Sequence, residues 1–292
     1  MTSLRNRAIS DRAARLPRSH GSVGRAGRAS ATLRGPDAVD ERLFVASVEK
    51  AMKVLETFDK QARSLSMSDI ALRTKMGRSA TQRFVYTLET LGYLKRDPAT
   101  RHYSLATKVF RFAHSVLASN AALESAYQIL WQLSEQTRET ISWVELDGDE
   151  IVVIGNIGSA HLTSINLPVG TRFPALSASS GQVLLAYAPL ELTTAMLARA
   201  GEDVRARLGS RSPTAYAELL GRVRRAGFSV TEKNLGQGSI SISAPIFDYA
   251  GRPIAALNLS TLKTRYSLEV ARKKLVPFVI KAARAASATV VT

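Results

Sequence analysis

Cysteine is absent from this chain of 292 residues. The protein therefore has no disulfides, no thiol nucleophile and no thiolate ligands for zinc or an iron–sulfur cluster. A chain without cysteine fits the reducing cytoplasm, where we expect this protein to work. Histidine is scarce as well, and the four residues show no spacing typical of metal ligands: His20, His102, His114 and His161. We therefore predict neither a metal nor another cofactor.

Long hydrophobic runs are also missing. No apolar stretch reaches the roughly 18 residues of a membrane-spanning helix, so we expect no membrane partner. Apolar residues still make up 45% of the chain, which is an ordinary share for a globular protein with a core. The length suggests about two domains of the usual roughly 100–200 residues.

Negative charge is in short supply. The chain has 40 Lys and Arg against 24 Asp and Glu, a formal net charge of +16, and such an excess favours polyanionic partners. Residues 1–40 are rich in Arg, Ser and Gly and poor in large apolar residues, so we predict a disordered basic tail there. This tail has either no further role or a non-specific attraction to phosphates, and it also resembles an organelle transit peptide.

Residues 41–106 show the pattern of a small helical domain. Its first predicted helix covers residues 47–58, with Ser47 as N-cap and an apolar stripe formed by Val48, Met52, Leu55 and Phe58. A second helix is predicted to begin at the cap Ser68 and to stop at Gly77. Its apolar positions are Ile70 and Leu72.

A third helix is predicted after a tight turn and ends at Gly92. Its apolar face is formed by Phe84, Val85, Leu88 and Leu91. Residues 93–105 follow, with apolar and aromatic positions on both sides of the turn sequence DPAT, which predicts a short β-hairpin. Three helices and a hairpin together indicate a winged helix-turn-helix.

The start of the third helix is polar and basic. In a helix-turn-helix this end enters the major groove, where Arg can pair with guanine and Gln with adenine. Basic residues of the wing would contact phosphates and supply salt-dependent affinity. We therefore predict contacts with double-stranded DNA from Arg78, Ser79, Thr81, Gln82, Arg83, Lys95, Arg96 and Arg101. Any one of these residues alone would more often belong to a solvated surface.

Residues 107–118 are predicted to form a linker helix. Its apolar positions, Val109, Phe112, Val116 and Leu117, favour packing against a partner. Residues 119–292 then predict a second domain of helices and antiparallel strands, which makes the whole chain α+β.

The second domain opens with a helix over residues 122–137. A hairpin follows around the turn sequence DGD at residues 147–149, with a further strand at residues 160–167. Helices are predicted at 179–188, 190–199 and 214–227, and strands at 228–232, 239–247 and 253–261. The terminal helix is expected to kink or break at Pro277.

Four segments, in order, resemble the IclR family of bacterial transcriptional regulators: SVEKAMKVLETF, GRSATQRFVYTLETLGYLKRD, SASSGQVLLA and RRAGFSVTEKNLGQGSISISAPIFDYAGRPIAALNLS. The likeness covers about residues 41–290. It implies a winged helix-turn-helix, a linker helix and a GAF-like effector domain with a central antiparallel sheet. It also implies homodimers that often pair into tetramers.

The resemblance also implies where a small organic acid binds. The positions that correspond to the family's effector site are Ser179, Ser180, Thr231, Asn234, Ser241, Asn258 and Ser260. This chain departs from the family at Gln182, where Lys is usual, and at the two neutral positions 231 and 234, which are usually acidic. These departures leave the identity of the acid open.

The residues themselves support a pocket in the same place. Strand alternation puts Ser241 and Ser243 on one face, and Asn258 and Ser260 on one face of another strand. If the strands are neighbours, these groups form one polar patch, and the start of the helix at Ser179 could hold an anion. The alternative is a solvated sheet face.

The leading hypothesis is therefore a transcriptional regulator that is controlled by an organic acid and is not an enzyme. Two alternatives stay open: the second domain is a dimerisation module without a ligand, or it carries an enzymatic activity. The absence of cysteine weighs against thiol chemistry, and no carboxylate pair or Ser/His/Asp set stands out.

Overall fold

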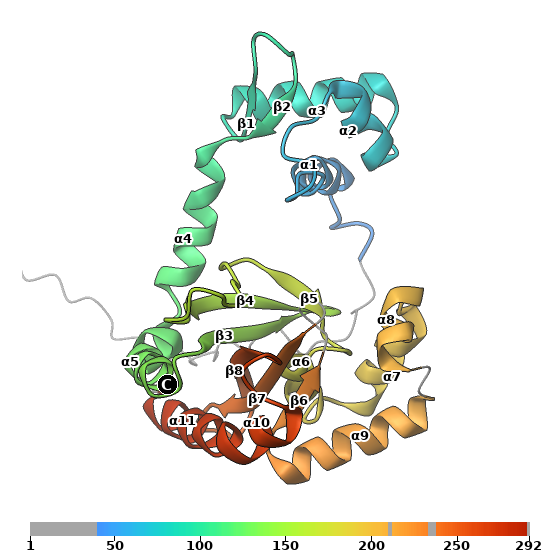
Figure 1. Ribbon diagram of the computed structural model, residues 1–292. Helices are drawn as coiled ribbons and strands as arrows, with labels where there is room; N and C mark the ends of the chain where they lie inside the picture. The colour runs from blue at the N-terminus through green and yellow to red at the C-terminus, as the bar shows by residue number, and fades with distance from the viewer. Residues whose placement is uncertain (1–39, 210–211, 233–237, 291–292) are drawn as a thin grey trace, which may run out of the picture. The chain divides into compact units, whose positions relative to one another are not determined.

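The computed structural model describes residues 40–209, 212–232 and 238–290 (Figure 1). The tail predicted for residues 1–40 lies outside this range except for its last residue. Two groups of elements have hydrophobic cores of their own. The core of the first lies within residues 54–103, and the second has two clusters, within residues 126–286 and 144–256. No helix of the described part is both long and apolar enough to cross a bilayer.

The first group is the predicted winged helix-turn-helix. It consists of α1 (Ala46–Glu56), α2 (Met67–Thr74), α3 (Arg78–Thr90), β1 (Leu94–Arg96) and β2 (Tyr103–Leu105). The two strands pair antiparallel and form the wing. The core that joins helices and wing contains Val54, Ile70, Val85, Leu88, Leu94 and Tyr103.

The predicted cap and stripe of α1 are wrong in detail. The N-cap is Val45 and not Ser47. Val48 and Met52 are exposed, whereas the neighbouring Val54 is buried. The helical period alone cannot tell which of two adjacent apolar faces the other helices will cover.

The second helix also begins and ends elsewhere than predicted. Its cap is Ser66, not Ser68: the Ser66 hydroxyl accepts the Asp69 N–H, and the Asp69 carboxylate accepts the Ser66 N–H. This reciprocal capping box satisfies two backbone donors. The helix ends at Thr74, and Gly77 caps the start of α3 instead of terminating α2. The predicted apolar positions Leu72 and Leu91 are exposed.

The linker contains a 3-10 turn, η2 (Thr107–Val109), and α4 (Phe110–Ala118). Phe110, Phe112 and Val116 are exposed, and Leu117 packs against the core of the second domain. The next helix, α5 (Ala121–Thr137), is capped by the side chain of Asn120.

The second domain has one antiparallel sheet, as predicted. Its strands are β3 (Thr140–Asp147), β4 (Glu150–Ile157), β5 (Arg172–Pro174), β6 (Ser229–Glu232), β7 (Ser239–Phe247) and β8 (Pro253–Leu262). Their order is β5-β4-β3-β8-β7-β6. The strand predicted at residues 160–167 is wrong: this segment is irregular, and two of its backbone carbonyls accept hydrogen bonds from side chains of other segments.

Helices cover both faces of the sheet (Figure 1). One face packs against α5, α10 (Leu268–Lys274) and α11 (Val276–Thr289), and the other against α6 (Ser179–Leu185), α7 (Leu190–Arg199) and α9 (Pro213–Ala226). The predicted break at Pro277 is confirmed, since it lies in the first turn of α11. The sequence did not indicate α8 (Glu202–Leu208).

Candidate DNA interface and effector pocket

An open groove of about 650 Å³ runs between the exposed face of α3 and the wing. It brings together six of the predicted DNA-contacting residues: Arg78, Ser79, Gln82, Arg83, Arg96 and Arg101. The α3 residues share a face because positions three and four apart are neighbours on a helix. The groove therefore combines groups that can read base edges with groups that can bind phosphate.

The start of α3 is suited to an anion. Gly77 at the N-cap has no side chain, so it cannot satisfy the first N–H groups of the helix. Those groups and the positive end of the helix dipole favour a phosphate oxygen. The preceding turn is short because Lys75 adopts a left-handed conformation, with φ of 56°.

The wing holds its basic residues by local contacts. The Asp97 carboxylate accepts the N–H groups of Ala99 and Thr100 at 2.8 and 3.0 Å, which fixes the turn. These bonds keep the pKa of Asp97 below its usual value. The Arg96 guanidinium lies 5.5 Å from the centre of the Tyr103 ring, so the buried tyrosine orients it.

Two predicted DNA contacts do not line this groove. Thr81 is fully buried, and its hydroxyl donates to the Gly77 carbonyl at 3.1 Å; it belongs to the core, so its prediction as a DNA contact is wrong. The sequence concealed this because Thr is mostly found exposed, so its residue type did not indicate an inward position. Lys95 is exposed on β1, next in sequence to Arg96 but not among the residues that line the groove. The groove also includes residues that we did not predict, among them Ser66, Ser68 and Tyr86. Tyr86 could have been found by its position one helical turn after Gln82 and Arg83.

A network of small polar side chains lies inside the second domain. Ser241 pairs with Ser260, and Ser243 with Asn258, in adjacent strands, as the alternation predicted. The Ser243 hydroxyl lies 2.8 Å from that of Ser179 and 3.0 Å from that of Ser180. It also donates to Asn258 Oδ1 at 3.0 Å, and Asn258 Nδ2 donates to Ser260 at 2.9 Å.

This patch is buried and not a solvated sheet face, because α6 covers it. Close packing requires Gly181: a Cβ there would lie 2.0 Å from the carbonyl oxygen of Ala175. The buried Gln182 accepts the Ser229 hydroxyl at 2.6 Å, so it ties α6 to β6. Thr231 is half-buried on β6, and Asn234 lies outside the described residues.

A small cavity separates this polar patch from an apolar wall. Its polar side is formed by Ser179, Ser180, Ser241 and Asn258, and its apolar side by Val144, Ile151, Val153, Leu167, Phe173 and Ala178. We did not predict this apolar side, although alternation along the β3–β4 hairpin could have indicated Val144, Ile151 and Val153. The cavity measures about 20 Å³, which is room for about one water molecule.

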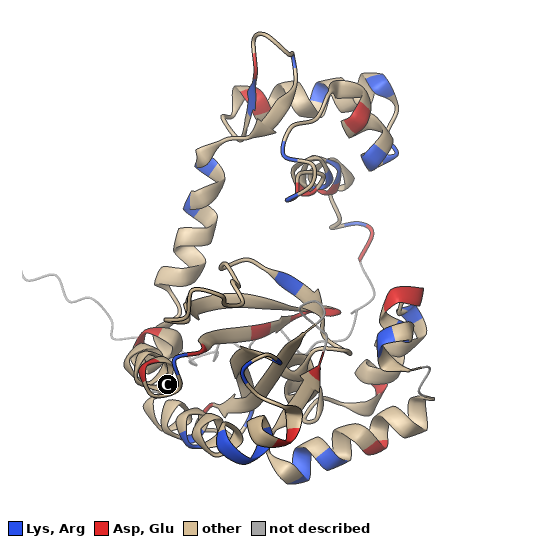
Figure 2. Ribbon diagram, viewed as in Figure 1, with Lys and Arg blue, Asp and Glu red and all other residues tan. Residues whose placement is uncertain are grey.

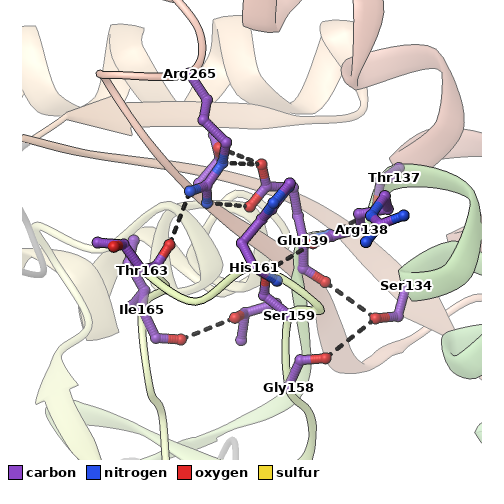
Figure 3. Close-up of polar contacts among 12 residues, drawn as sticks. Ser134, Thr137, Arg138, Glu139, Gly158, Ser159, His161, Thr163, Ile165 and Arg265 are labelled. Carbon is purple, nitrogen blue, oxygen red and sulfur yellow. Dashed lines mark hydrogen bonds and ion pairs between the residues drawn. The ribbon is translucent and has the colours of Figure 1, made fainter.

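The loop of residues 158–171 lies over this cavity and contributes Leu167 to it. Figure 3 shows how side chains hold the loop. Arg265 Nη1 donates to the Thr163 carbonyl at 2.8 Å, and Thr140 Oγ1 donates to the Ile165 carbonyl at 2.8 Å. Arg265 is itself held by Glu139.

The Glu139 carboxylate is fully buried and receives two bonds from the Arg265 guanidinium, at 2.7 and 2.6 Å (Figure 3). It also accepts the Thr261 hydroxyl at 2.8 Å. The bonds with Glu139 raise the pKa of Arg265 above its usual value. This bidentate pair connects β3, β8 and the loop, and neither partner was singled out from the sequence.

Comparisons with known proteins match both the helix-turn-helix and the second domain. A family described as the bacterial transcriptional regulator IclR C-terminal matches residues 114–288, and the IclR helix-turn-helix domain matches residues 47–98. The Pca regulon regulatory protein of Pseudomonas putida is 33% identical over 242 residues, which are 82% of each chain.

Solved structures show the same fold. A transcriptional regulator from Rhodococcus sp. RHA1 is 30% identical, with a TM-score of 0.69 over 85% of this chain and 98% of that one. An IclR homologue from Microbacterium hydrocarbonoxydans, solved with 4-hydroxybenzoate, has a TM-score of 0.66 and 23% identity. It covers 83% of this chain and 98% of its own.

A winged helix-turn-helix followed by an α+β domain defines a DNA-binding regulator of transcription. The chain belongs to the IclR family of such regulators. Its relatives are regulators of transcription, which confirms the expectation of a regulator over that of an enzyme.

Proposed function

We propose that the groove between α3 and the wing reads the operator. Arg78, Gln82 and Arg83 enter the major groove, and Lys95, Arg96 and Arg101 contact phosphates. The observation that carries this proposal is the gathering of exposed cations and amide groups in one groove of about 650 Å³. The same proposal places the DNA-binding domain at residues 41–106, the linker helix at residues 107–118 and the effector domain at residues 119–292.

The test is the substitution Arg83→Ala, assayed on an operator selected from random DNA by the purified protein. Loss of one bidentate base contact costs about 1–3 kcal/mol, so operator affinity should fall roughly 5- to 150-fold. Lys53→Ala is the matched control, because Lys53 lies on α1 and pairs with Glu49. Unchanged affinity in Arg83→Ala would refute this placement of the recognition helix.

We further propose that the effector is a small organic acid with an aromatic ring. The pocket supports this, since its apolar wall includes Phe173 and its polar patch offers hydroxyl and amide groups at hydrogen-bonding distance from one another. The Microbacterium relative binds 4-hydroxybenzoate. The cavity of about 20 Å³ is much too small for such an acid, so binding requires the loop of residues 158–171 to move.

Thermal-shift titration with 4-hydroxybenzoate and with short aliphatic acids separates a sensor from a ligand-free dimerisation module. A sensor is stabilised by ligand, and Ser241→Ala should weaken that binding about 10-fold, the usual effect of one hydrogen bond to a charged group. Ser229→Ala is the control, because Ser229 is buried but does not line the cavity. Absence of any stabilisation across the acids would favour the module.

We also propose that the protein is a homodimer that works in the cytoplasm. Two such dimers can pair into a tetramer. The dimer is supported by exposed apolar residues near α1 and on α4: Phe44, Val48, Met52, Phe110, Phe112 and Val116. A two-fold dimer would present two α3 helices to a palindromic operator. Sedimentation of the purified protein measures its oligomeric state, and a monomer at working concentration would contradict the proposal.

A further inference from the structure

A second groove lies in the effector domain, between the C-terminal end of α9, the end of β7 and α11. It measures about 370 Å³ and shares no lining residue with the cavity beside Ser241. Its volume lies in the range of pockets that hold small molecules, which is roughly 300–1,000 Å³. Neither the regulator's DNA groove nor its effector pocket uses it.

The floor of this groove is apolar and partly aromatic. It includes Tyr187, Phe247 and Ile280. The rings of Tyr187 and Phe247 meet edge to face, with centroids 5.1 Å apart and planes at 82°. Such a floor can accept a flat apolar body, because aromatic side chains favour stacked or edge-to-face neighbours.

The rim of the groove is cationic. Arg224, Arg225 and Arg284 line it, and within the described residues none of the three forms an ion pair with a carboxylate. Among the other described arginines of the domain, Arg172, Arg199, Arg252 and Arg265 have carboxylate partners, whereas Arg138, Arg205, Arg207, Arg222 and Arg272 form no ion pair. The groove is therefore distinguished by having three unpaired arginines around one aromatic floor and not by the lack of pairing alone. Figure 2 shows Lys and Arg along α9, α10 and α11, and α11 contains no acidic residue.

A helix dipole accounts for only part of this rim. Arg224 and Arg225 occupy the last turn of α9, where cations offset the negative end of the dipole. Arg284 lies on α11, more than a turn before its end at Thr289, so the dipole effect does not apply to it. The Arg224 guanidinium lies 5.0 Å from the centre of the Tyr187 ring, which places it beside the aromatic floor.

We propose that this groove is a second small-molecule site, which binds a doubly charged anion on a flat apolar body. The ring lies on Phe247 and Tyr187, while Arg225 and Arg284 hold the charged groups by charge-assisted hydrogen bonds. An aromatic dicarboxylate and an aryl phosphate share this chemistry. The site stands whether or not the cavity beside Ser241 binds an acid.

The test is calorimetric titration of the full chain with phthalate and, separately, with phenyl phosphate. At least one should bind saturably, and the double variant Arg225→Gln with Arg284→Gln should weaken that binding by about 10-fold or more. Benzoate, with a single charge, should lose less affinity in this double variant than the dianion does, because any binding beside Ser241 does not depend on the two arginines. Whichever of the two dianions binds more tightly assigns the charged group as carboxylate or phosphate.

The control is Arg272→Gln with Lys274→Gln, which removes the same charge from exposed positions on α10 that do not line the groove. This control variant should bind the dianion within about twofold of the parent protein, because substitutions at unpaired surface residues usually have effects of this size. No saturable binding of either dianion would overturn the proposal. Equal weakening in both double variants would also overturn it, because net charge alone would then explain the binding.

Discussion

The groove between α3 and the wing and the cavity beside Ser241 use polar side chains in opposite ways. In the groove, Arg78, Gln82 and Arg83 are exposed and open to an incoming ligand. Beside the cavity, Ser179 and Asn258 are buried and are joined through the Ser243 hydroxyl. Water screens the charges of the groove. The polar groups beside the cavity are buried, so their hydrogen bonds are costly to leave unmade.

This difference predicts that substitutions inside the effector domain change stability, whereas those in the DNA groove change binding. The largest effect is expected at Glu139. Glu139→Ala leaves the Arg265 guanidinium and the Thr261 hydroxyl without their shared acceptor. Because the guanidinium keeps some access to water, the free energy of unfolding should fall by about 3 kcal/mol, the lower end of the range for breaking a buried ion pair. Urea unfolding measures this loss.

The matched control for Glu139 is Glu150→Ala, which breaks an ion pair with Arg172 at the surface. Exposed pairs contribute about 0–1 kcal/mol. Equal losses in the two variants would show that burial of Glu139 does not set its importance.

A smaller loss of the free energy of unfolding is expected when Ser243 is substituted. Ser243→Ala removes the donor to Asn258 Oδ1 and the hydroxyl that Ser179 and Ser180 share. A buried acceptor without its partner costs about 1–3 kcal/mol, again measured by urea unfolding. Ser115→Ala on the exposed face of α4 should stay within about 0.5 kcal/mol. A Ser243 variant as stable as this control would mean that the network contributes nothing.

The DNA groove should behave in the opposite way. Lys95→Ala is expected to leave the free energy of unfolding within about 0.5 kcal/mol, because the side chain is exposed. The slope of the logarithm of operator affinity against that of salt concentration should become shallower by about 0.9, the contribution of one phosphate contact. An unchanged slope in a salt titration would remove Lys95 from the interface.

The smallest effect concerns pH. Bonds from the Ser66 hydroxyl and then from its N–H lower the pKa of Asp69 below the usual 3.8. Because the folded pKa is the lower one, the stabilisation is complete at neutral pH and is lost as the pH falls from about 5 through the folded pKa. Asp69→Asn should show a flatter decline of thermal stability between pH 5 and about pH 3. Parallel curves for the parent and the variant would contradict this.

The helix-turn-helix was largely predictable because its signals are local. Gly77, the basic start of α3 and the turn at Asp97 lie within about 20 residues of one another, so one short segment contained most of the residues that line the groove. The error at Thr81 arose because a helix start has both an outer and an inner face. The packing of α3 on α1 and α2 decides which side chain faces inward.

The sequence by itself therefore determined the helix-turn-helix, the alternation that places Ser241 with Ser243, and the family. Only the tertiary structure decided that these serines meet Ser179 under α6, that Glu139 pairs with Arg265, and that three arginines surround an aromatic groove. The physical reason is separation along the chain: Glu139 and Arg265 are 126 positions apart, and no local pattern records which distant strand or helix will bring two such residues together.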